Sequence, residues 1–131
     1  MRSSTRVANA AFATKICSTE DAATTIADGD NIGMSGFTGG YPKAVPAALV
    51  ERIVESAAAG RRMRVGVWTG ASTAPELDGA LADVDGIELR LPYQSDPVIR
   101  AKINSGRMEY IDIHLSQVAR RVWEADHPLP V

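Results

Sequence analysis

Short apolar runs alternate with helix-like segments along the whole chain. Each run is rich in Val, Ile, Leu or Met and is bounded by glycine, proline or charged residues, a pattern typical of strands buried inside a sheet. The first run leads directly into a glycine cluster, and the second ends at Thr69 in front of another glycine. We therefore predict four strands, at residues 31–35, 63–69, 87–91 and 110–113.

Helix signals fill the intervals between these runs. Ser18 is a suitable N-cap, because the acidic Glu20 and Asp21 follow it in the first turn, and Gly29 is the expected stop. Apolar residues recur at helical spacing in the later intervals as well. The other helices are predicted to start near Pro42, at Ser72 or Thr73, at Asp96 and at Ser116.

Strands joined to one another through helices indicate the α/β class. We expect an open, mainly parallel sheet of about four strands with helices on both faces, folded as one domain over residues 1–131. Ligands of such sheets bind at the carboxyl ends of the strands. Two glycine-bearing turns occupy that position, at residues 35–42 after the first strand and at residues 69–73 after the second.

Composition narrows the range of partners. With 14 basic and 16 acidic side chains the formal charge is −2, and aromatic residues make up only 5% of the chain, so neither nucleic acid nor an anionic membrane is expected as a partner. A single cysteine, Cys17, excludes an internal disulfide. We expect a cytoplasmic protein, with a mitochondrial transit peptide at the basic, Ser/Thr-rich start as the alternative.

The first turn does not have the spacing of a nucleotide fingerprint. Its glycines stand at 33, 36, 39 and 40, whereas dinucleotide binding needs Gly-x-Gly-x-x-Gly, and Lys43 is not preceded by a P-loop glycine. No NAD or ATP cofactor is predicted. Backbone N–H groups ahead of a helix favour a carboxylate, a phosphate or a developing oxyanion. The alternative is a tight turn that needs glycine for its backbone angles and binds nothing.

The second turn adds two hydroxyl groups, and its alternative interpretation is a plain N-cap. Ser72 lacks the Gly-x-Ser-x-Gly context of a nucleophile, and His114 and His127 are expected in a turn and in the tail. No catalytic residue and no metal site is predicted. Several acidic residues are expected to be solvated, namely Glu51, Glu55, Glu76, Asp78, Asp83 and Asp85.

The stretch Gly33-Met-Ser-Gly-Phe-Thr-Gly-Gly-Tyr-Pro-Lys-Ala-Val-Pro-Ala-Ala-Leu closely resembles the N-terminal region of the acetyl-CoA hydrolase/transferase family. That family belongs to the class I CoA-transferases and includes succinyl-CoA:acetate CoA-transferase. The resemblance continues through Thr69-Gly-Ala-Ser-Thr, Arg90-Leu-Pro-Tyr-Gln-Ser-Asp and Tyr110-Ile-Asp-Ile-His, and it covers residues 10–119 without a break in order.

The resemblance implies covalent chemistry between two α/β halves of a much longer protein. A glutamate attacks the acyl-CoA, CoA is taken up as a glutamyl-CoA thioester, and a small carboxylate or water completes the exchange. CoA is thus a substrate, and no separate cofactor is implied. By resemblance the candidate substrate-binding residues are Gly36, Phe37, Thr38, Gly39, Gly40 and Pro42, with Gly70, Ala71, Ser72 and Thr73 as secondary candidates.

Two departures from the family pattern qualify this interpretation. The first turn has one residue fewer between Phe37-Thr38 and Tyr41-Pro42, and residues 120–131 form a divergent tail. The nucleophilic glutamate belongs to the family's second half, and no glutamate of this chain matches it. We expect a truncated N-terminal domain, inactive alone, whose partner is the missing C-terminal half or a second subunit.

Two alternatives belong to other classes. One is a non-catalytic α/β module that binds an anion or a partner through its glycine turns. The other is the remnant of an interrupted gene, which would expose the apolar face meant for the missing half and would not fold stably.

Overall fold

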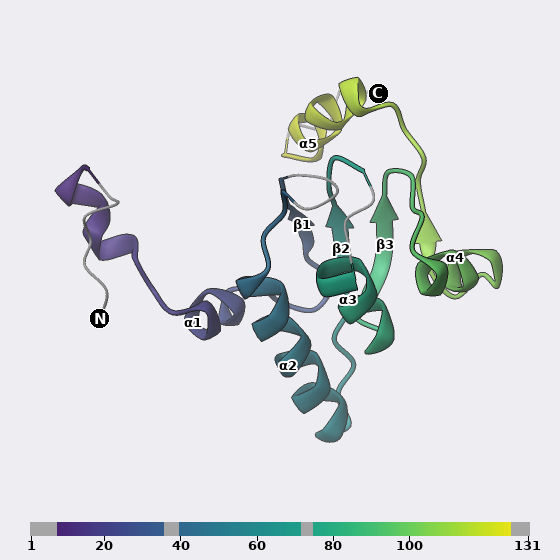
Figure 1. The fold of residues 1–131 in the computed structure, drawn as a ribbon, viewed down its shortest axis with the longest axis horizontal. Helices are drawn as coiled ribbons and strands as arrows, with labels where there is room; N and C mark the ends of the chain where they lie inside the picture. Colours follow the sequence, from purple (N-terminus) through teal and green to yellow (C-terminus); the bar gives the residue numbers. More distant parts are fainter. Residues whose placement is uncertain (1–7, 36–39, 72–74, 127–131) are drawn as a thin grey trace.

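A computed structural model describes residues 8–35, 40–71 and 75–126 of the chain. One parallel sheet forms its centre, with the strand order β1-β2-β3-β4 (Figure 1). The strands are β1 (Asn31–Gly33), β2 (Val65–Trp68), β3 (Ile87–Leu91) and β4 (Glu109–Tyr110). The predicted α/β class and open four-stranded sheet are confirmed, and β3 has the predicted bounds. β1 and β2 are shorter than predicted, and β4 begins one residue before and ends three residues before the predicted bounds 110–113.

Helical segments precede, connect and follow the strands. They are η2 (Ala10–Lys15), α1 (Thr19–Thr24), α2 (Ala44–Ala58), the π-helical turn η3 (Pro75–Gly79), α3 (Ala80–Asp83), α4 (Pro97–Asn104), η4 (Leu115–Gln117) and α5 (Val118–Asp126). None of the helices within the described ranges has the length and apolar character needed to cross a membrane. Helix α5 lies beyond the carboxyl ends of the strands (Figure 1).

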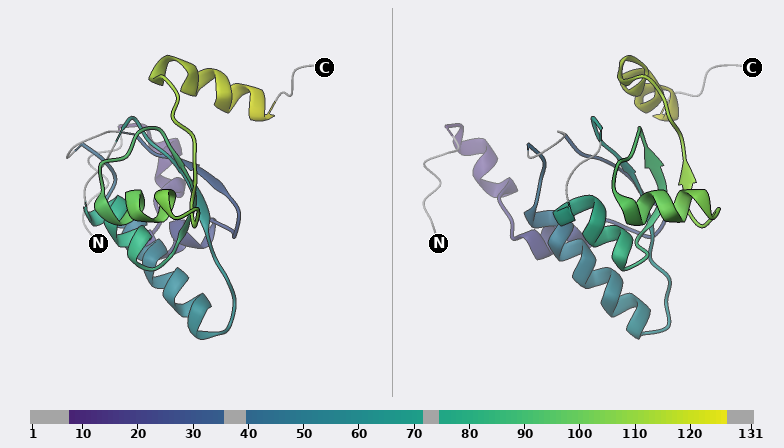
Figure 2. Two further views of the ribbon diagram at one scale, coloured as in Figure 1. Left: turned by 90° about the vertical axis from the view of Figure 1, so that its right-hand side faces the viewer. Right: turned by 45° about the vertical axis from the view of Figure 1, so that its right-hand side comes forward.

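The connecting helices α2, α3 and α4 all lie on one face of the sheet (Figure 2). Consecutive strands are neighbours here, and right-handed crossovers between neighbours in one direction place every connecting helix on the same side. The structure therefore differs from the expectation of helices on both faces. Within the described residues, no helix packs against the second face.

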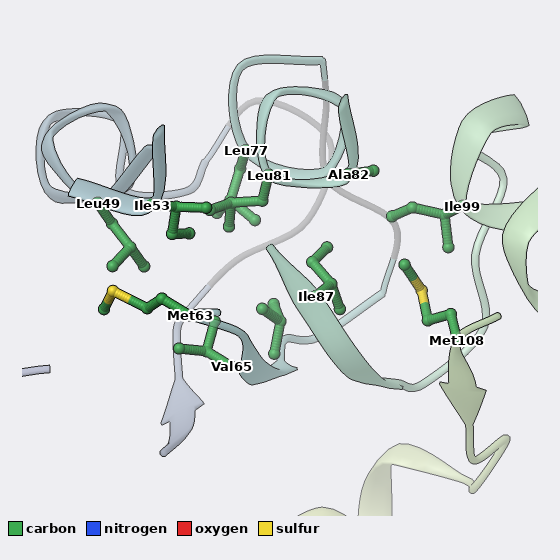
Figure 3. Packing of buried hydrophobic residues seen from close by; sticks show 11 residues of the cluster. Leu49, Ile53, Met63, Val65, Leu77, Leu81, Ala82, Ile87, Ile99 and Met108 are labelled. Atoms are coloured by element: carbon green, nitrogen blue, oxygen red, sulfur yellow. The ribbon is translucent and has the colours of Figure 1, made fainter. Parts of the chain in front are cut away.

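The hydrophobic core lies between the sheet and this helical layer (Figure 3). It is almost entirely aliphatic, as the low aromatic content predicts, and complete burial of each such side chain stabilises the fold by about 1.5–3 kcal/mol. Its buried members are Leu49, Ile53, Met63, Val65, Val67, Leu77, Leu81, Ala82, Ile87, Ile99 and Met108. The core thus fixes α2, α3 and α4 against the strands that carry the glycine turns.

The first α-helix starts at the predicted cap but ends early. Ser18 Oγ accepts a hydrogen bond from the backbone N–H of Asp21 at 3.0 Å, so this N-cap is confirmed. The helix ends at Thr24, well before the expected stop at Gly29. The hydroxyls of Thr24 and Thr25 each donate to the carbonyl three residues earlier, at 2.7 Å, and such local bonds compete with continued helix formation.

The caps of the last two helical stretches differ in how well they were predicted. Asp96 caps α4 as expected, because its Oδ1 accepts from the backbone N–H groups of Val98 and Ile99 at 2.9 and 3.0 Å. The expected start at Ser116 is wrong. His114 is the N-cap of η4, and its Nδ1 accepts from the N–H of Ser116 at 3.3 Å.

Candidate functional site

Both predicted turns leave the same edge of the sheet. β1 and β2 are adjacent and parallel, with Gly33 opposite Trp68. The N–H of Met34 donates to the carbonyl of Trp68 at 2.8 Å, so pairing continues to the last residue before each turn. The carboxyl ends of these strands therefore lie side by side, in the position where parallel α/β sheets bind ligands.

Only part of the first turn can be located. The candidates Gly36, Phe37, Thr38 and Gly39 lie outside the described residues. Gly40 is exposed and Pro42 is half-buried, and both precede α2. These two positions thus stand between the end of β1 and the helix that covers the sheet.

The second turn borders two hollows at this edge. Gly70 and Ala71 are half-buried directly after β2, whereas Ser72 and Thr73 lie outside the described residues. A hollow of about 590 Å³ separates these glycine-turn residues from Tyr93 and His114. A second hollow, of about 480 Å³, also reaches Gly70 and extends between the ends of β1 and β2 and helix α5. The second turn is therefore accessible to a ligand from two sides.

The two hollows differ in chemistry. The first is lined partly by polar groups, among them Asp112 and His114. The second is lined mostly by apolar side chains, including Met34, Trp68 and Val118. Among the described residues, no group of three or more His, Cys, Asp or Glu side chains could hold a metal ion. The edge thus offers a ligand polar side chains on one side of Gly70 and a mostly apolar wall on the other.

A shift in strand register brings an arginine to this edge. Val65 pairs with Ile87 but Gly66 pairs with Leu89, so Glu88 is an additional residue on β3. Side chains alternate between the two faces of a sheet, and one additional residue reverses the alternation that follows it. Arg90 consequently points to the same face as Ile87, into the helical layer, and both are fully buried.

The buried Arg90 is paired with Asp78 of the π-helical turn η3. Its Nε donates to Asp78 Oδ1 at 2.9 Å and its Nη2 to Oδ2 at 3.2 Å, which is the bidentate geometry typical of arginine with a carboxylate. Asp78 has no exposed surface. The expectation that Asp78 is solvated is wrong, because η3 directs this side chain inward beneath the second turn.

Glu76 lies on the exposed side of the same π-helical turn and contacts the residues that follow the first turn. Its Oε2 accepts from Tyr41 Oη at 2.7 Å, and its Oε1 lies 3.3 Å from Lys43 Nζ. The hydrogen bond from Tyr41 is the main cause that lowers the pKa of the Glu76 carboxyl. In return, hydrogen bonding to Glu76 raises the pKa of Tyr41 and of Lys43.

Sequence reasoning missed these anchoring residues. It placed Arg90 in a strand and Thr69 at the end of one, without assigning either a task. The available signal was an arginine between two leucines, Leu89 and Leu91, near the end of the predicted strand 87–91. A charged side chain that is buried needs a buried partner, and Asp78 supplies it for Arg90.

The comparisons identify the family. The model of the acetyl-CoA hydrolase/transferase N-terminal domain matches residues 1–127. This chain belongs to the acetyl-CoA hydrolase/transferase family. The two glycine turns at the carboxyl edge are therefore part of this family's N-terminal domain.

Curated relatives include both transferases and hydrolases. The chain is 38% identical over 118 residues to succinyl-CoA:acetate CoA-transferase of Clostridium kluyveri, which covers 89% of this chain and 21% of that protein. It is 40% identical over 103 residues to propanoyl-CoA:succinate CoA transferase of Escherichia coli (78% and 21%). It is also 40% identical over 117 residues to acetyl-CoA hydrolase of Schizosaccharomyces pombe (86% and 22%). The chain thus spans about a fifth of the length of these relatives.

The fold is shared with solved structures. RipA from Yersinia pestis superposes with a TM-score of 0.55 at 22% identity, over 79% of this chain and 25% of that one. A RipA mutant gives a TM-score of 0.59 at 22% identity, over 83% and 26%. At this identity the likeness concerns the fold alone.

Proposed function

We propose that this chain is the N-terminal portion of an acetyl-CoA hydrolase or acetate CoA-transferase, which moves CoA between an acyl-CoA and a small carboxylate. The observation that carries the proposal is the family match over residues 1–127, together with the adjacent glycine turns at the carboxyl edge of the sheet. The relatives named for this chemistry include both transferases and hydrolases. We keep the cytoplasm as the expected location, on the basis of the single cysteine.

In the proposed reaction, a glutamate outside this chain attacks the carbonyl carbon of the acyl-CoA. This attack expels CoA as a thiolate and forms an acyl-glutamyl anhydride; the thiolate then attacks the glutamyl carbonyl, the acyl group leaves as a carboxylate, and CoA is held as a glutamyl-CoA thioester. An incoming carboxylate takes up CoA by the reverse steps, or water hydrolyses the thioester, and either route restores the free glutamate. Each addition places negative charge on a carbonyl oxygen, and backbone N–H groups held in place beforehand stabilise that charge. This chain would supply such groups from its two glycine turns and border the acyl or carboxylate site.

The nucleophile is not among the described glutamates that lie near the edge. Glu76 stands beside the turns, and its carboxylate is engaged by Tyr41 and Lys43. Glu124 of α5 is paired with Arg120. Glu51 and Glu55 belong to α2 and are exposed. We therefore infer that catalysis needs the remaining part of the protein or a second subunit. The second face of the sheet, on which no described helix packs, supports this requirement.

A chimera tests the proposal. Residues 10–119 replace the matching region of the Clostridium kluyveri relative, and acetyl-CoA formation from succinyl-CoA and acetate is measured. We expect the chimera to exchange CoA, because this chain supplies the same wall of the site, and we expect the 131-residue chain alone to give no exchange. The relative without its N-terminal region is the control for background activity.

Two results would contradict the proposal in different ways. Exchange by the isolated chain would mean that it contains its own nucleophile. A chimera that is folded and binds CoA but exchanges none would favour the binding-module alternative, in which the glycine turns hold an anion or a partner without chemistry.

A further inference from the structure

The backbone of the second glycine turn is held from inside the protein. The carbonyl oxygen of Ala71 accepts hydrogen bonds from Thr69 Oγ1 at 2.5 Å and from Arg90 Nη2 at 3.3 Å. Both donors are buried, with 4% of Thr69 and none of Arg90 exposed. Two buried donors on one carbonyl oxygen hold it pointing inward, so the turn backbone has one preferred orientation.

The threonine hydroxyl and the guanidinium act as one unit. Arg90 Nη2 donates to Thr69 Oγ1 at 2.7 Å, and the hydroxyl therefore uses its own proton for the carbonyl of Ala71. The backbone N–H of Thr69 donates to the carbonyl of Leu91 at 3.2 Å, and Arg90 Nη1 donates to the same carbonyl. An unbroken series of hydrogen bonds thus connects β3 to the second glycine turn through Arg90 and Thr69.

The identity of the cation matters for this arrangement. Arginine carries five N–H donors in a rigid plane, whereas lysine carries one compact charge. Arg90 uses this plane to reach Asp78, Thr69 and the backbone carbonyls of Val67, Ala71 and Leu91. A buried ion pair is a weak source of net stability compared with apolar residues of the same volume. Apolar residues, however, carry no N–H donor that could orient the carbonyl of Ala71.

We propose that Thr69 and Arg90 are positioning residues for the second glycine turn, and that they keep Gly70 and Ala71 in the conformation that meets the acyl or carboxylate group. The proposal rests on the proposed function for the identity of the ligand. The positioning itself rests on the hydrogen bonds to the Ala71 carbonyl. Gly70 and Ala71 line the hollow at the carboxyl edge, so a change in their backbone changes the wall that a substrate meets.

Substitutions of Thr69 separate positioning from packing. Thr69→Val keeps the volume and the branched shape but removes the hydroxyl, and Thr69→Ser keeps the hydroxyl but removes the methyl group. Both are made in the 131-residue chain, and ¹⁵N relaxation gives the order parameters of Gly70 and Ala71, with Val67 in β2 as the internal reference. In the valine variant we expect the order parameters of Gly70 and Ala71 to fall from about 0.85 to below about 0.6, while that of Val67 stays unchanged. The serine variant should keep the parent values.

A titration with sodium acetate adds the functional readout. The amide signals of Gly70 and Ala71 should move with acetate in the parent and the serine variant, and the apparent Kd should weaken at least about tenfold in the valine variant, a factor equal to about 1.4 kcal/mol. Equal order parameters in parent and valine variant overturn the positioning role, and so does a serine variant as mobile as the valine variant. If the parent itself shows no acetate-dependent shift, the proposed function fails for this turn, whereas the order parameters still decide the positioning.

Discussion

Two carboxylates on one short π-helical turn have opposite environments. Asp78 is buried against Arg90, and Glu76, two positions earlier, is exposed beside Tyr41 and Lys43. The first lies beneath the second glycine turn, and the other holds the residues that follow the first glycine turn. Short π-helical segments occur frequently at functional sites. Here one such segment is linked to both glycine turns, to the second through Asp78 and to the first through Glu76.

Removal of the buried carboxylate charge should be costly. In Asp78→Asn the guanidinium of Arg90 keeps its charge in the core without a counter-charge, so we expect the free energy of unfolding to fall by about 3–5 kcal/mol. Urea unfolding measures this loss. Asp83→Asn on α3 is the matched control, because Asp83 is exposed, and it should stay within about 0.5 kcal/mol of the parent. Equal losses in the two variants would mean that the buried ion pair contributes no more to the free energy of unfolding than an exposed carboxylate does.

The exposed carboxylate gives a prediction about pH. Tyr41 is the main cause of the lowered pKa of Glu76, so Tyr41→Phe should raise that pKa back toward its ordinary value of 4.5. Because the folded pKa is the lower one, the contact stabilises the fold above pH 4.5 and is lost as the pH falls through the folded value. A ¹³C NMR titration of the Glu76 carboxyl carbon measures the midpoint directly.

Lys43→Gln is the control for this titration. The hydrogen bond from the lysine and its charge each lower the pKa of Glu76 less than the tyrosine hydrogen bond does. Glutamine removes the charge but keeps a hydrogen-bond donor, so this variant should move the midpoint upward by a smaller step than Tyr41→Phe. A larger shift in the lysine variant than in Tyr41→Phe would show that charge, and not the phenol hydrogen bond, controls the carboxyl.

At the scale of elements, local signals were enough to find each strand and two of the helix caps. Ser18 and Asp96 were predictable because capping depends on the first turn of a helix alone. The face of the sheet on which the helices lie was not predictable from local signals, since it depends on which strands become neighbours. The burial of Arg90 escaped prediction for a related reason: the additional residue Glu88 arises from pairing with β2, which no pattern within β3 records.

Gly86 lies where α2 closely approaches the start of β3, so we expect its replacement to destabilise the fold. A Cβ at this position would lie 2.6 Å from Ile53 Cδ1 and 3.1 Å from the carbonyl oxygen of Leu81, so the end of the buried Ile53 side chain would have to repack and the Leu81 carbonyl would have to shift slightly. We expect Gly86→Ala to lower the free energy of unfolding by about 1–3 kcal/mol in urea unfolding. Gly33→Ala, where nothing lies within 4 Å of the added carbon, should change it by less than about 0.5 kcal/mol.

At the scale of the whole molecule, helices within residues 8–35, 40–71 and 75–126 pack on one face of the sheet and leave the other face without a helix. The helical layer and core lie on one side, and within the described residues no helix packs on the other (Figure 2). The chain spans about a fifth of the length of its relatives, so an uncovered face is what a part of a larger protein would have. The question at this scale is whether the covered side alone holds the chain in a folded state.

Limited digestion with trypsin tests whether the chain folds alone, because trypsin-sensitive peptide bonds lie both outside and inside the folded core. Lys15 belongs to η2, which has no buried residue and extends away from the sheet (Figure 1). Arg90 and Lys102 are buried. If the chain folds alone, cleavage after Lys15 needs only local opening, and cleavage after the two buried residues needs global unfolding and should be more than about a hundredfold slower. Mass spectrometry of the time course gives both rates. Equal rates would mean that the isolated chain is unfolded, which favours the remnant of an interrupted gene over a domain awaiting its partner.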